Sequence, residues 1–437
     1  MPVSSVLDAA CLRQDFYALC DAGGRFAGTP SELAARRYVT QRLVAIANGA
    51  SRSQTYPYDG WRRIATRAGL AGGRSIDATS LVLSPPVRDA EFEVVDLGRG
   101  TFEEFERERG RIAGRAVLVR HEFPFSVQHV HRRRKYAWAK EAAAAAFCIA
   151  NYLPGVGVVA GSSGRGEPGD IPAVGLSYEG GQRLAQAASA GPAGIRLTIE
   201  SERAPMEGAH VIFELPGTVD EWVVVCAHLD GHDLADSALD NATGAAAVLA
   251  IAQALASAGD LRRGVRCMLF TFEEWGLYGS SVYVQGLSEE ERRKIALVVN
   301  LDTICGAGRL SVLVSGMDDV AAFIGRTTDG VAMPIDVVAP VMANSDHYNF
   351  FLAGIPSFRL IAGYEDPTAL TRFLLTPADR REIVDLDDLR VGTEVALRIA
   401  HAAARSAEPI ARHRSAAEVR ALLDLDDPWV SDRMGAS

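Results

Sequence analysis

The sequence predicts an α/β fold in which a largely parallel mixed sheet is sandwiched by helices and a small α/β unit is inserted. Two observations carry this prediction. From about residue 207 onward, short and nearly all-apolar strands alternate with helical stretches, which is typical of a parallel sheet covered on both faces. Residues 85–205 show a different pattern of predicted strands and helices. A chain of 437 residues is long enough for more than one structural unit.

The N-terminal region, residues 1–84, is assigned to the first part of the main domain. Apolar residues recur at helical spacing over residues 31–46, and Ser31 stands where a helix N-cap is expected. We therefore expect a helix to begin at Ser31.

The inserted unit is assigned to residues 85–205. It combines two predicted strands and two predicted helices: strands at 115–121 and 171–177, an Ala-rich helix at 134–150, and a helix at 179–190. This order predicts a small α/β unit of its own.

The main part of the domain is assigned to residues 206–425, followed by a loose tail at 426–437. Apolar runs of strand length alternate there with longer helical runs. The predicted strands are 211–215, 222–228, 265–272, 296–302 and 310–316, and the predicted helices are 243–256 and 276–287.

The composition argues against some classes of partner. The 45 Lys and Arg residues stand against 55 acidic residues, and nucleic acids and anionic membranes both require clustered basic residues. We interpret the one basic run, residues 131–135, as a solvated helix face, and contact with an acidic ligand or partner is the alternative. The most apolar helical stretch, residues 243–258, is shorter than the about 20 residues that span a bilayer. We expect no nucleic-acid partner and no membrane partner, and a homo-oligomer is an open alternative.

The six cysteines are scattered without CxxC spacing, which favours reduced thiols over a disulfide framework. The N-terminal residues lack the basic and apolar regions of a secretory signal. These two features lead us to expect a cytoplasmic protein.

Polar residues stand at the ends of three predicted strands. His228 and Asp230 follow the first, Glu273 and Glu274 follow the second, and Asp302 follows the third. The carboxyl ends of parallel strands meet at one edge of a sheet, so these side chains are expected to converge on one crevice. Asp240 precedes the helix at 243–256. Taken alone it is equally well explained as a helix cap, but helix capping does not account for the whole set.

These residue types suit a zinc site. Imidazole and carboxylates are the usual zinc ligands apart from thiolates, and a carboxylate such as Asp240 can bridge two ions. Of two adjacent glutamates, one can bind metal while the other acts as general base. Asp230, two residues after His228, is placed to orient the imidazole. The sequence contains no GxSxG turn that would favour a serine hydrolase.

Four motifs resemble those of the double-zinc exopeptidases, a family that includes secreted bacterial aminopeptidases and plasma glutamate carboxypeptidase. The motifs are HLDGHDLADSALDNATG, FTFEEWGLYGS, VVNLDTICG and NSDHYNFFLAGIP. The resemblance covers residues 207 to about 400 and the segment GRFAGTPSELAARRYV. The inserted unit, with IAGRAVLVRHEF and IPAVGLSYEGGQRLAQA, resembles the protease-associated domain often found in these enzymes.

The resemblance implies a role for each strand-end residue. His228 and Asp302 would bind one zinc, and Asp240 would bridge to a second zinc held by Glu274. Glu273 would be the general base, and Asp230 would support His228. The reaction implied is attack of a water deprotonated by the glutamate on an amide carbonyl, with the metals stabilising the oxyanion.

One position departs from the family pattern. The family supplies the last ligand of the second zinc from a histidine in a stretch like HTxxD, whereas this chain has Leu375 at that place and Asp379 at its end. Leucine cannot bind zinc, so one ion or two is left open. His347, with its neighbour Asp346, is a candidate for a substitute ligand or for substrate binding, and a purely structural role for His347 is the third alternative.

We expect a zinc-dependent hydrolase of peptide or amide bonds, either an aminopeptidase or a small-peptide amidase. A single-zinc dipeptidase or carboxypeptidase is an alternative, for which Arg359 and Arg372 are candidate partners of a terminal carboxylate. The other alternative is a family-derived binding protein without catalysis. The related glutaminyl cyclases hold zinc through the late histidine, so cyclisation is not favoured.

Overall fold

The computed structural model describes residues 6–164, 166–331 and 333–423, which form two compact units. Unit 1 contains the described residues up to Pro57, then Glu207–Leu374 and Asp379–Leu423. Unit 2 contains Tyr58–Met206 and the short segment Leu375–Ala378. The predicted tail, residues 426–437, lies outside the described residues.

The insert begins earlier in the chain than predicted, at Tyr58 and not at residue 85, whereas its end at Met206 is close to the predicted residue 205. The reason is the length of two paired strands, β1 (Ala50–Leu70) and β8 (Gly194–Leu215), in which the boundaries between the units fall. A long strand with mostly exposed or half-buried residues has no break in its sequence that would mark a domain boundary.

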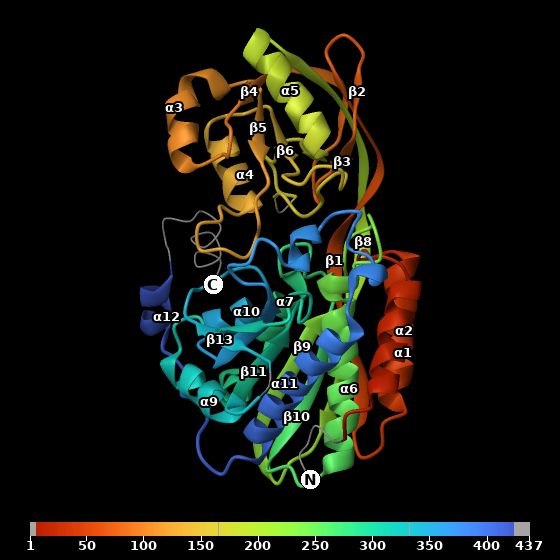
Figure 1. The fold of residues 1–437 in the computed structure, drawn as a ribbon, viewed down its shortest axis with the longest axis vertical. Coiled ribbons are helices and arrows are strands. Elements are labelled where there is room, and N and C mark those ends of the chain that lie inside the picture. Colours follow the sequence, from red (N-terminus) through yellow and green to blue (C-terminus); the bar gives the residue numbers. More distant parts are fainter. Residues whose placement is uncertain (1–5, 165, 332, 424–437) are drawn as a thin grey trace. The chain divides into compact units, whose positions relative to one another are not determined.

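Unit 1 is built on a mixed sheet in the strand order β13–β12–β14–β11–β9–β10–β8 (Figure 1). The central strands β14, β11, β9 and β10 are parallel, and β12 and β8 are antiparallel to their neighbours in this sheet β14 and β10. The strands not yet delimited are β9 (Val219–His228), β10 (Arg263–Phe270), β11 (Ile295–Leu301), β12 (Leu310–Leu313), β13 (Ile335–Val338) and β14 (Ser357–Ala362). The predicted largely parallel mixed sheet is confirmed.

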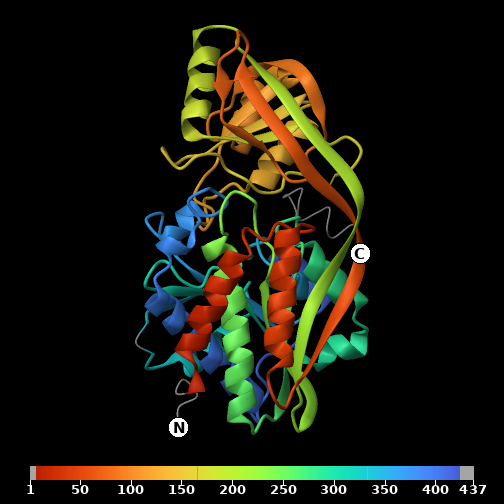
Figure 2. The same cartoon turned by 90° about the vertical axis from the view of Figure 1, so that its right-hand side faces the viewer.

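Helices cover both faces of this sheet. α6 (Thr243–Ala258) and α11 (Leu386–Arg405) pack against β9 and β10, and α1 (Ala9–Asp21) and α2 (Pro30–Val44) lie beside α6 (Figure 2). On the other face, α7 (Tyr278–Gly286) and α10 (His347–Leu352) close an apolar cluster with side chains from the sheet. The remaining short elements of unit 1 are α8 (Glu289–Lys294), α9 (Asp318–Thr328), α12 (Ala416–Leu422), η2 (Ala238–Ala242), η3 (Leu370–Phe373) and η4 (Arg381–Ile383).

The stretch Ala238–Ala258 is the single segment, among the described residues, that is long and apolar enough to cross a membrane. It contains α6, which is apolar around most of its circumference because the sheet, α1 and α11 surround it. Since 78% of its most apolar window is buried, this length and composition are those of a core helix.

The first predicted helix is present, but its cap differs from the prediction. α2 begins at Pro30, and the side chain of Thr29, not that of Ser31, accepts the backbone N–H of Glu32. Proline at the first helical position is favoured because its missing N–H would have no partner there. The Ser31 hydroxyl instead accepts the backbone N–H of Arg25 at 2.8 Å.

Unit 2 has a smaller sheet in the order β8–β4–β5–β6–β7–β3. Strands β4 to β7 are parallel, with α3 and α4 on one face and α5 on the other. The bounds are β2 (Ser75–Ile76), β3 (Ala78–Ser80), β4 (Val87–Asp96), β5 (Ala116–Arg120), β6 (Ala146–Ala150), β7 (Ala173–Leu176), α3 (Phe102–Ile112), α4 (Arg132–Glu141) and α5 (Tyr178–Ala190). The predicted small α/β unit is confirmed.

Two predictions within unit 2 were wrong. The Ala-rich helix ends at Glu141, and the residues from Ala146 to Ala150 form β6, because pairing with β5 and β7 in a buried sheet outweighs the helix propensity of alanine. The basic run is also not a solvated face. Arg132, Arg133 and Lys135 are all buried, and the Lys135 ammonium forms an ion pair with Glu122.

Candidate metal centre

The candidate site lies at the carboxyl ends of three neighbouring strands. β9 lies between β10 and β11, and all three are parallel. His228 is the last residue of β9, Asp302 follows the last residue of β11, and Glu273 comes three residues after the end of β10. The parallel order predicted from the sequence therefore brings these residues to one edge of the sheet.

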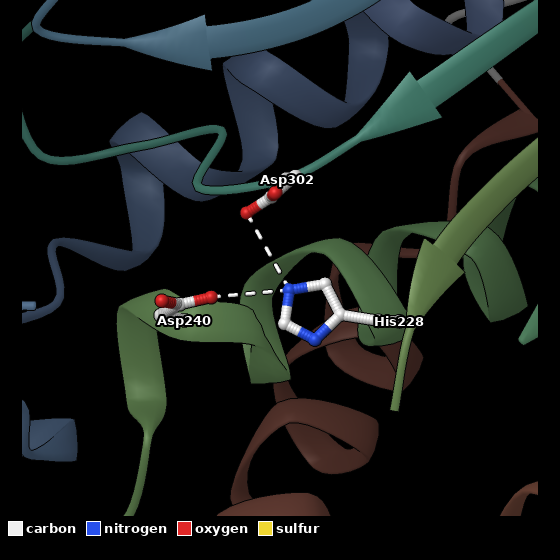
Figure 3. A group of neighbouring side chains, drawn as sticks. All are labelled: His228, Asp240 and Asp302. Carbon is white, nitrogen blue, oxygen red and sulfur yellow. Dashed lines mark ion pairs between the residues drawn. The ribbon is translucent and has the colours of Figure 1, made fainter. Parts of the chain in front are cut away.

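Three predicted ligands form a compact cluster, His228, Asp240 and Asp302 (Figure 3). One ligand atom from each lies within 4.8 Å of the others. The Nε2 atom of His228 lies 3.1 Å from Oδ1 of Asp240 and 3.6 Å from Oδ1 of Asp302. The side chains of His228 and Asp302 are almost fully buried, and that of Asp240 is 14% exposed. The cluster is thus accessible from the Asp240 side.

The tautomer of His228 follows from its second ring nitrogen. Nδ1 lies 2.9 Å from the backbone carbonyl oxygen of Asp230. Because a carbonyl can only accept, Nδ1 carries a hydrogen, and Nε2 is the ring nitrogen that faces the two carboxylates and can bind a metal when it is deprotonated. This is the orientation that a metal-binding histidine requires.

Asp230 supports the site in a different way from the one predicted. Its carbonyl oxygen orients His228, while its carboxylate oxygen stays 3.9 Å from Nδ1. The carboxylate instead accepts the backbone N–H groups of Glu273 and Glu274 at 3.1 and 3.2 Å. Asp230 therefore couples the end of β9 to the loop that carries both glutamates.

Asp240 lies in the turn η2, and two other residues hold that turn. The carboxylate of Asp379 accepts the backbone N–H groups of Leu239 and Asp240 at 2.7 and 3.2 Å. Asn241 donates to the carbonyl of Leu301 at 2.8 Å, which ties the turn to the end of β11. Sequence reasoning assigned no role to either residue, although Asp379 ends the LTPAD stretch.

Arg25 is a third residue that holds the backbone around the site and to which sequence reasoning gave no role. Its buried guanidinium donates to backbone carbonyls on both sides of the site loop, among them Leu229 at 2.9 Å, Asp236 at 2.7 Å and Ser237 at 2.6 Å. Five backbone carbonyls accept from this side chain; the other two belong to Leu19 and Gly23. An arginine with five donors can hold an irregular loop in one conformation.

The second oxygen of Asp302 is held by a buried arginine. Nη2 of Arg359 lies 3.1 Å from Oδ2 of Asp302, while the hydroxyl of Thr303 donates to Oδ1 at 2.9 Å. Burial alone would raise the pKa of the Asp302 carboxyl, but Arg359 and the interaction with His228 hold that pKa well below its usual range. Asp302 is therefore ionised. Arg359 is 2% exposed and forms an ion pair with Asp302, a predicted ligand, which contradicts its predicted role as a partner of a substrate carboxylate.

Glu273 and Glu274 lie in the loop after β10, and each is 7% exposed. Burial raises the pKa of Glu273 well above its usual value; the charge of His228 opposes this shift and that of Glu274 adds to it. A carboxylate with a raised pKa is suited to act as general base near neutral pH.

His347 and Asp346 are both buried, at the start of α10. Burial lowers the pKa of His347 to about 3, so this imidazole is neutral, and burial raises the pKa of Asp346 to about 7. Among the described residues, neither belongs to the cluster with metal-binding spacing. The geometry thus gives no support to His347 as a substitute ligand.

Leu375 is part of unit 2. Its carbonyl oxygen accepts the backbone N–H of Ala160 at 2.7 Å, and its side chain packs against an apolar cluster of unit 2 that includes Val159. An apolar side chain at this position provides packing and no metal ligand.

The donor set fits a zinc ion. Among the described residues no well-aligned hydrogen bond satisfies the buried Nε2 atom of His228, although two carboxylate oxygens face it. Burial by itself would lower the pKa of His228, but Glu273, Asp240 and Asp302 raise it well above the usual value. This shift reflects the negative charge gathered around Nε2. Buried carboxylates need a positively charged partner, and imidazole nitrogens and carboxylate oxygens are the usual zinc ligands apart from thiolates.

Two family matches cover most of the chain. Residues 210–400 match peptidase family M28, and residues 81–184 match the PA domain. The first range contains the whole cluster, and the second lies inside unit 2.

Curated relatives include fungal aminopeptidases. The probable leucine aminopeptidase 2 of Aspergillus fumigatus is 30% identical over 321 residues, which is 70% of this chain and 62% of the relative. The probable leucine aminopeptidase 2 of Aspergillus oryzae is 29% identical over 67% of this chain and 60% of the relative. The chain thus spans about three fifths of the length of these two relatives.

Solved structures share the fold. An aminopeptidase from Aneurinibacillus sp. strain AM-1 superposes with a TM-score of 0.72 at 22% identity, covering 95% of this chain and 98% of that one. A peptidase M28 precursor from Shewanella amazonensis SB2B gives a TM-score of 0.77 at 20% identity, covering 94% and 97%.

Proposed function

We propose that this chain is a zinc-dependent aminopeptidase. The premise is that it carries a peptidase family M28 domain with an inserted PA domain. The observation that carries the proposal is the cluster of His228, Asp240 and Asp302 at the strand ends, with Glu273 in the adjoining loop. The leucine aminopeptidases among its relatives support an exopeptidase that acts at the amino end of a peptide.

His228, Asp240 and Asp302 would hold the zinc, and Glu273 would handle the proton. A bound zinc ion supplies a Lewis acid that polarises the amide carbonyl and activates a water. Glu273 takes the proton of the attacking water and returns it to the leaving amine, a role consistent with its raised pKa. The carboxylate of Asp230 fixes the position of Glu273 by accepting its backbone N–H.

We propose that one zinc ion occupies the site. Three protein ligands plus one open position are the usual arrangement of a catalytic zinc. In the family that this chain resembles, a histidine at the position of Leu375 binds the second zinc. The side chain of Leu375 instead packs in unit 2. This position therefore does not supply the histidine that would bind a second zinc together with Glu274.

The buried contacts of Arg359 favour an aminopeptidase over a carboxypeptidase. Recognition of a terminal carboxylate needs an accessible cation, and the guanidinium of Arg359 is directed to Asp302 and to the carbonyl of Asn344. Arg372, the other candidate, donates to the carbonyl of Thr368.

The proposal is tested with a matched set of peptides. Free dipeptides and aminoacyl anilides are compared with the same compounds carrying an acetylated amino end, in the zinc-loaded and the chelator-treated protein. We expect hydrolysis of the free-amine substrates only, lost with chelator and restored by zinc. Equal turnover of acetylated substrates would overturn the aminopeptidase assignment, and full activity after complete zinc removal would overturn the mechanism.

A catalytically inactive binding protein is the second candidate, suggested by Leu375. The two hydrogen bonds from the backbone N–H groups of Glu273 and Glu274 to Asp230 speak against it, because they hold the proposed general base beside the proposed ligands. Binding of a peptide without its hydrolysis, at full zinc loading, would favour this candidate.

The proposed substrate is a small peptide, and a nucleic-acid or membrane partner is not part of the proposal. A cytoplasmic location is proposed because all six cysteines are free thiols, five of them buried. Cell fractionation tests it, and recovery of the protein in the culture medium would contradict it.

A further inference from the structure

Asp302 presents its two carboxylate oxygens to different partners. Oδ1 faces Nε2 of His228 at 3.6 Å and accepts the hydroxyl of Thr303 at 2.9 Å. Oδ2 faces Nη2 of Arg359 at 3.1 Å. Oδ1 is therefore the oxygen directed to His228, while Oδ2 forms an ion pair with the guanidinium of Arg359.

The arginine itself is rigidly placed. Arg359 lies on β14, where its backbone is paired with Asn300 of β11, two residues before Asp302. Nη1 donates to the carbonyl of Asn344 at 3.0 Å, and Nε and Nη2 approach the carbonyl of Asp302 at 3.4 Å. At 2% exposure, this guanidinium is little screened by solvent.

A buried cation on the far side of a ligand has two opposite effects on metal binding. It orients the carboxylate, and loss of such an outer partner typically weakens metal affinity about 10- to 100-fold. It also withdraws negative charge from the ligand and repels a dication, which weakens affinity while the arginine is present. The Thr303 hydroxyl also holds Oδ1, so one orienting contact remains when the arginine is removed, and we expect the charge effect to be the larger of the two.

We propose that Arg359 is a positioning residue that keeps Asp302 a single-oxygen, weakened ligand, so that the metal is bound less tightly and stays more electrophilic toward substrate. This proposal rests on the zinc-dependent function proposed above. It explains why a buried cation is placed beside a site that must itself bind a cation.

The test replaces Arg359 by methionine, which keeps much of the volume and removes the charge, in the whole 437-residue chain. Zinc affinity is measured by competition with a chromophoric chelator. For Arg359→Met we expect a zinc Kd at least about tenfold lower than that of the wild type. We expect kcat to fall at least about tenfold with KM changed less than about threefold, because transition-state stabilisation is lost and substrate binding is not.

Two further variants separate charge from structure. Arg359→Lys keeps the charge but not the planar fork, and we expect its zinc Kd to stay within about threefold of the wild type. Arg263→Met removes another buried, ion-paired arginine of unit 1, at the opposite end of β10, and we expect zinc affinity and kcat to be unchanged. If Arg359→Met does not fold, Arg359→Gln, which also removes the charge, takes its place with the same expected zinc Kd.

The inference would be overturned if Arg359→Met bound zinc more weakly than the wild type. It would also be overturned if Arg359→Lys lost more than about tenfold in zinc affinity. Either result would show that Arg359 only orients Asp302. A wild-type protein that binds no zinc or does not hydrolyse peptides would overturn the proposed function instead. The two failures are therefore distinguishable.

Discussion

The carboxylate of Asp379 is bonded to the backbone of Asp240, 139 residues earlier in the chain, through an N–H···O bond of 3.2 Å. The other carboxylate oxygen accepts the N–H of Leu239 at 2.7 Å. Burial raises the pKa of Asp379 to about 7, and these two hydrogen bonds oppose the shift. Asp379 thus orients the backbone of Asp240, a proposed metal ligand, and lies outside the cluster of His228, Asp240 and Asp302.

We expect Asp379→Asn to weaken zinc binding about 10- to 100-fold, because an amide offers only one acceptor oxygen and its NH₂ group would face a backbone N–H. Asp8→Asn is the matched control, since Asp8 also accepts two backbone N–H groups but at the exposed start of α1. Chelator competition measures both variants. Equal zinc affinity in Asp379→Asn and wild type would show that the turn keeps its geometry without Asp379.

Glu273→Gln is expected to lower kcat by about 10²- to 10⁴-fold, because glutamine cannot accept a proton from water. Zinc content should be unchanged, since Glu273 is outside the ligand cluster. Glu289→Gln is the control and should retain full activity, because the side chain of Glu289 is exposed on α8. Elemental analysis and kcat are measured on the same samples. An unchanged kcat in Glu273→Gln would refute its role as general base.

The parts of the site that were predictable from the sequence are those that depend on strand periodicity. Three apolar runs ending in His228, Glu273 and Asp302 predicted parallel strands, and parallel strands bring their carboxyl ends together. The same reasoning assigned Arg359 to a substrate carboxylate and missed its contact with Asp302, because that contact depends on the register of β14 against β11, where Arg359 pairs with Asn300. An arginine within an apolar strand has no local signal that tells whether it faces a ligand, a substrate or solvent.

The boundaries of the fold were harder to predict than its elements. Ala146–Ala150 reads as helix because alanine is the best helix former, and only its position between β5 and β7 makes it a strand. The segment Leu375–Ala378 is assigned to unit 2 although it follows a long stretch of unit 1. Such non-local packing leaves no periodicity in the sequence.

The wild-type protein is expected to bind one zinc ion per chain. The reason is that Leu375 stands where the resemblance places the histidine of a second zinc, and its side chain packs against an apolar cluster of unit 2. Zinc is counted by elemental analysis after removal of loosely bound metal. Two ions in the wild type would contradict the one-zinc proposal.

Glu32 gives a pH dependence that is independent of hydrolysis. It is 1% exposed at the start of α2, and burial raises its pKa to about 7, opposed by Arg36. The pKa of Glu32 is higher in the folded than in the unfolded state. Its contribution to the free energy of unfolding is therefore fully present below the unfolded-state pKa of about 4.3. It is lost as the pH rises through about 7, because the buried carboxyl must then ionise.

Glu32→Gln removes this ionisation and keeps the side-chain volume. We expect the variant to be more stable than the wild type by about 1–3 kcal/mol at pH 8, since one pKa unit corresponds to about 1.4 kcal/mol. At pH 4.5 the wild-type carboxyl is already protonated in the folded state, so the gain should disappear. Urea unfolding of both proteins at the two pH values measures the difference. Glu290→Gln, on the exposed side of α8, should show no such dependence. An equal effect of Glu32→Gln at both pH values would mean that Glu32 stays ionised in the folded protein, held by Arg36 at 3.5 Å.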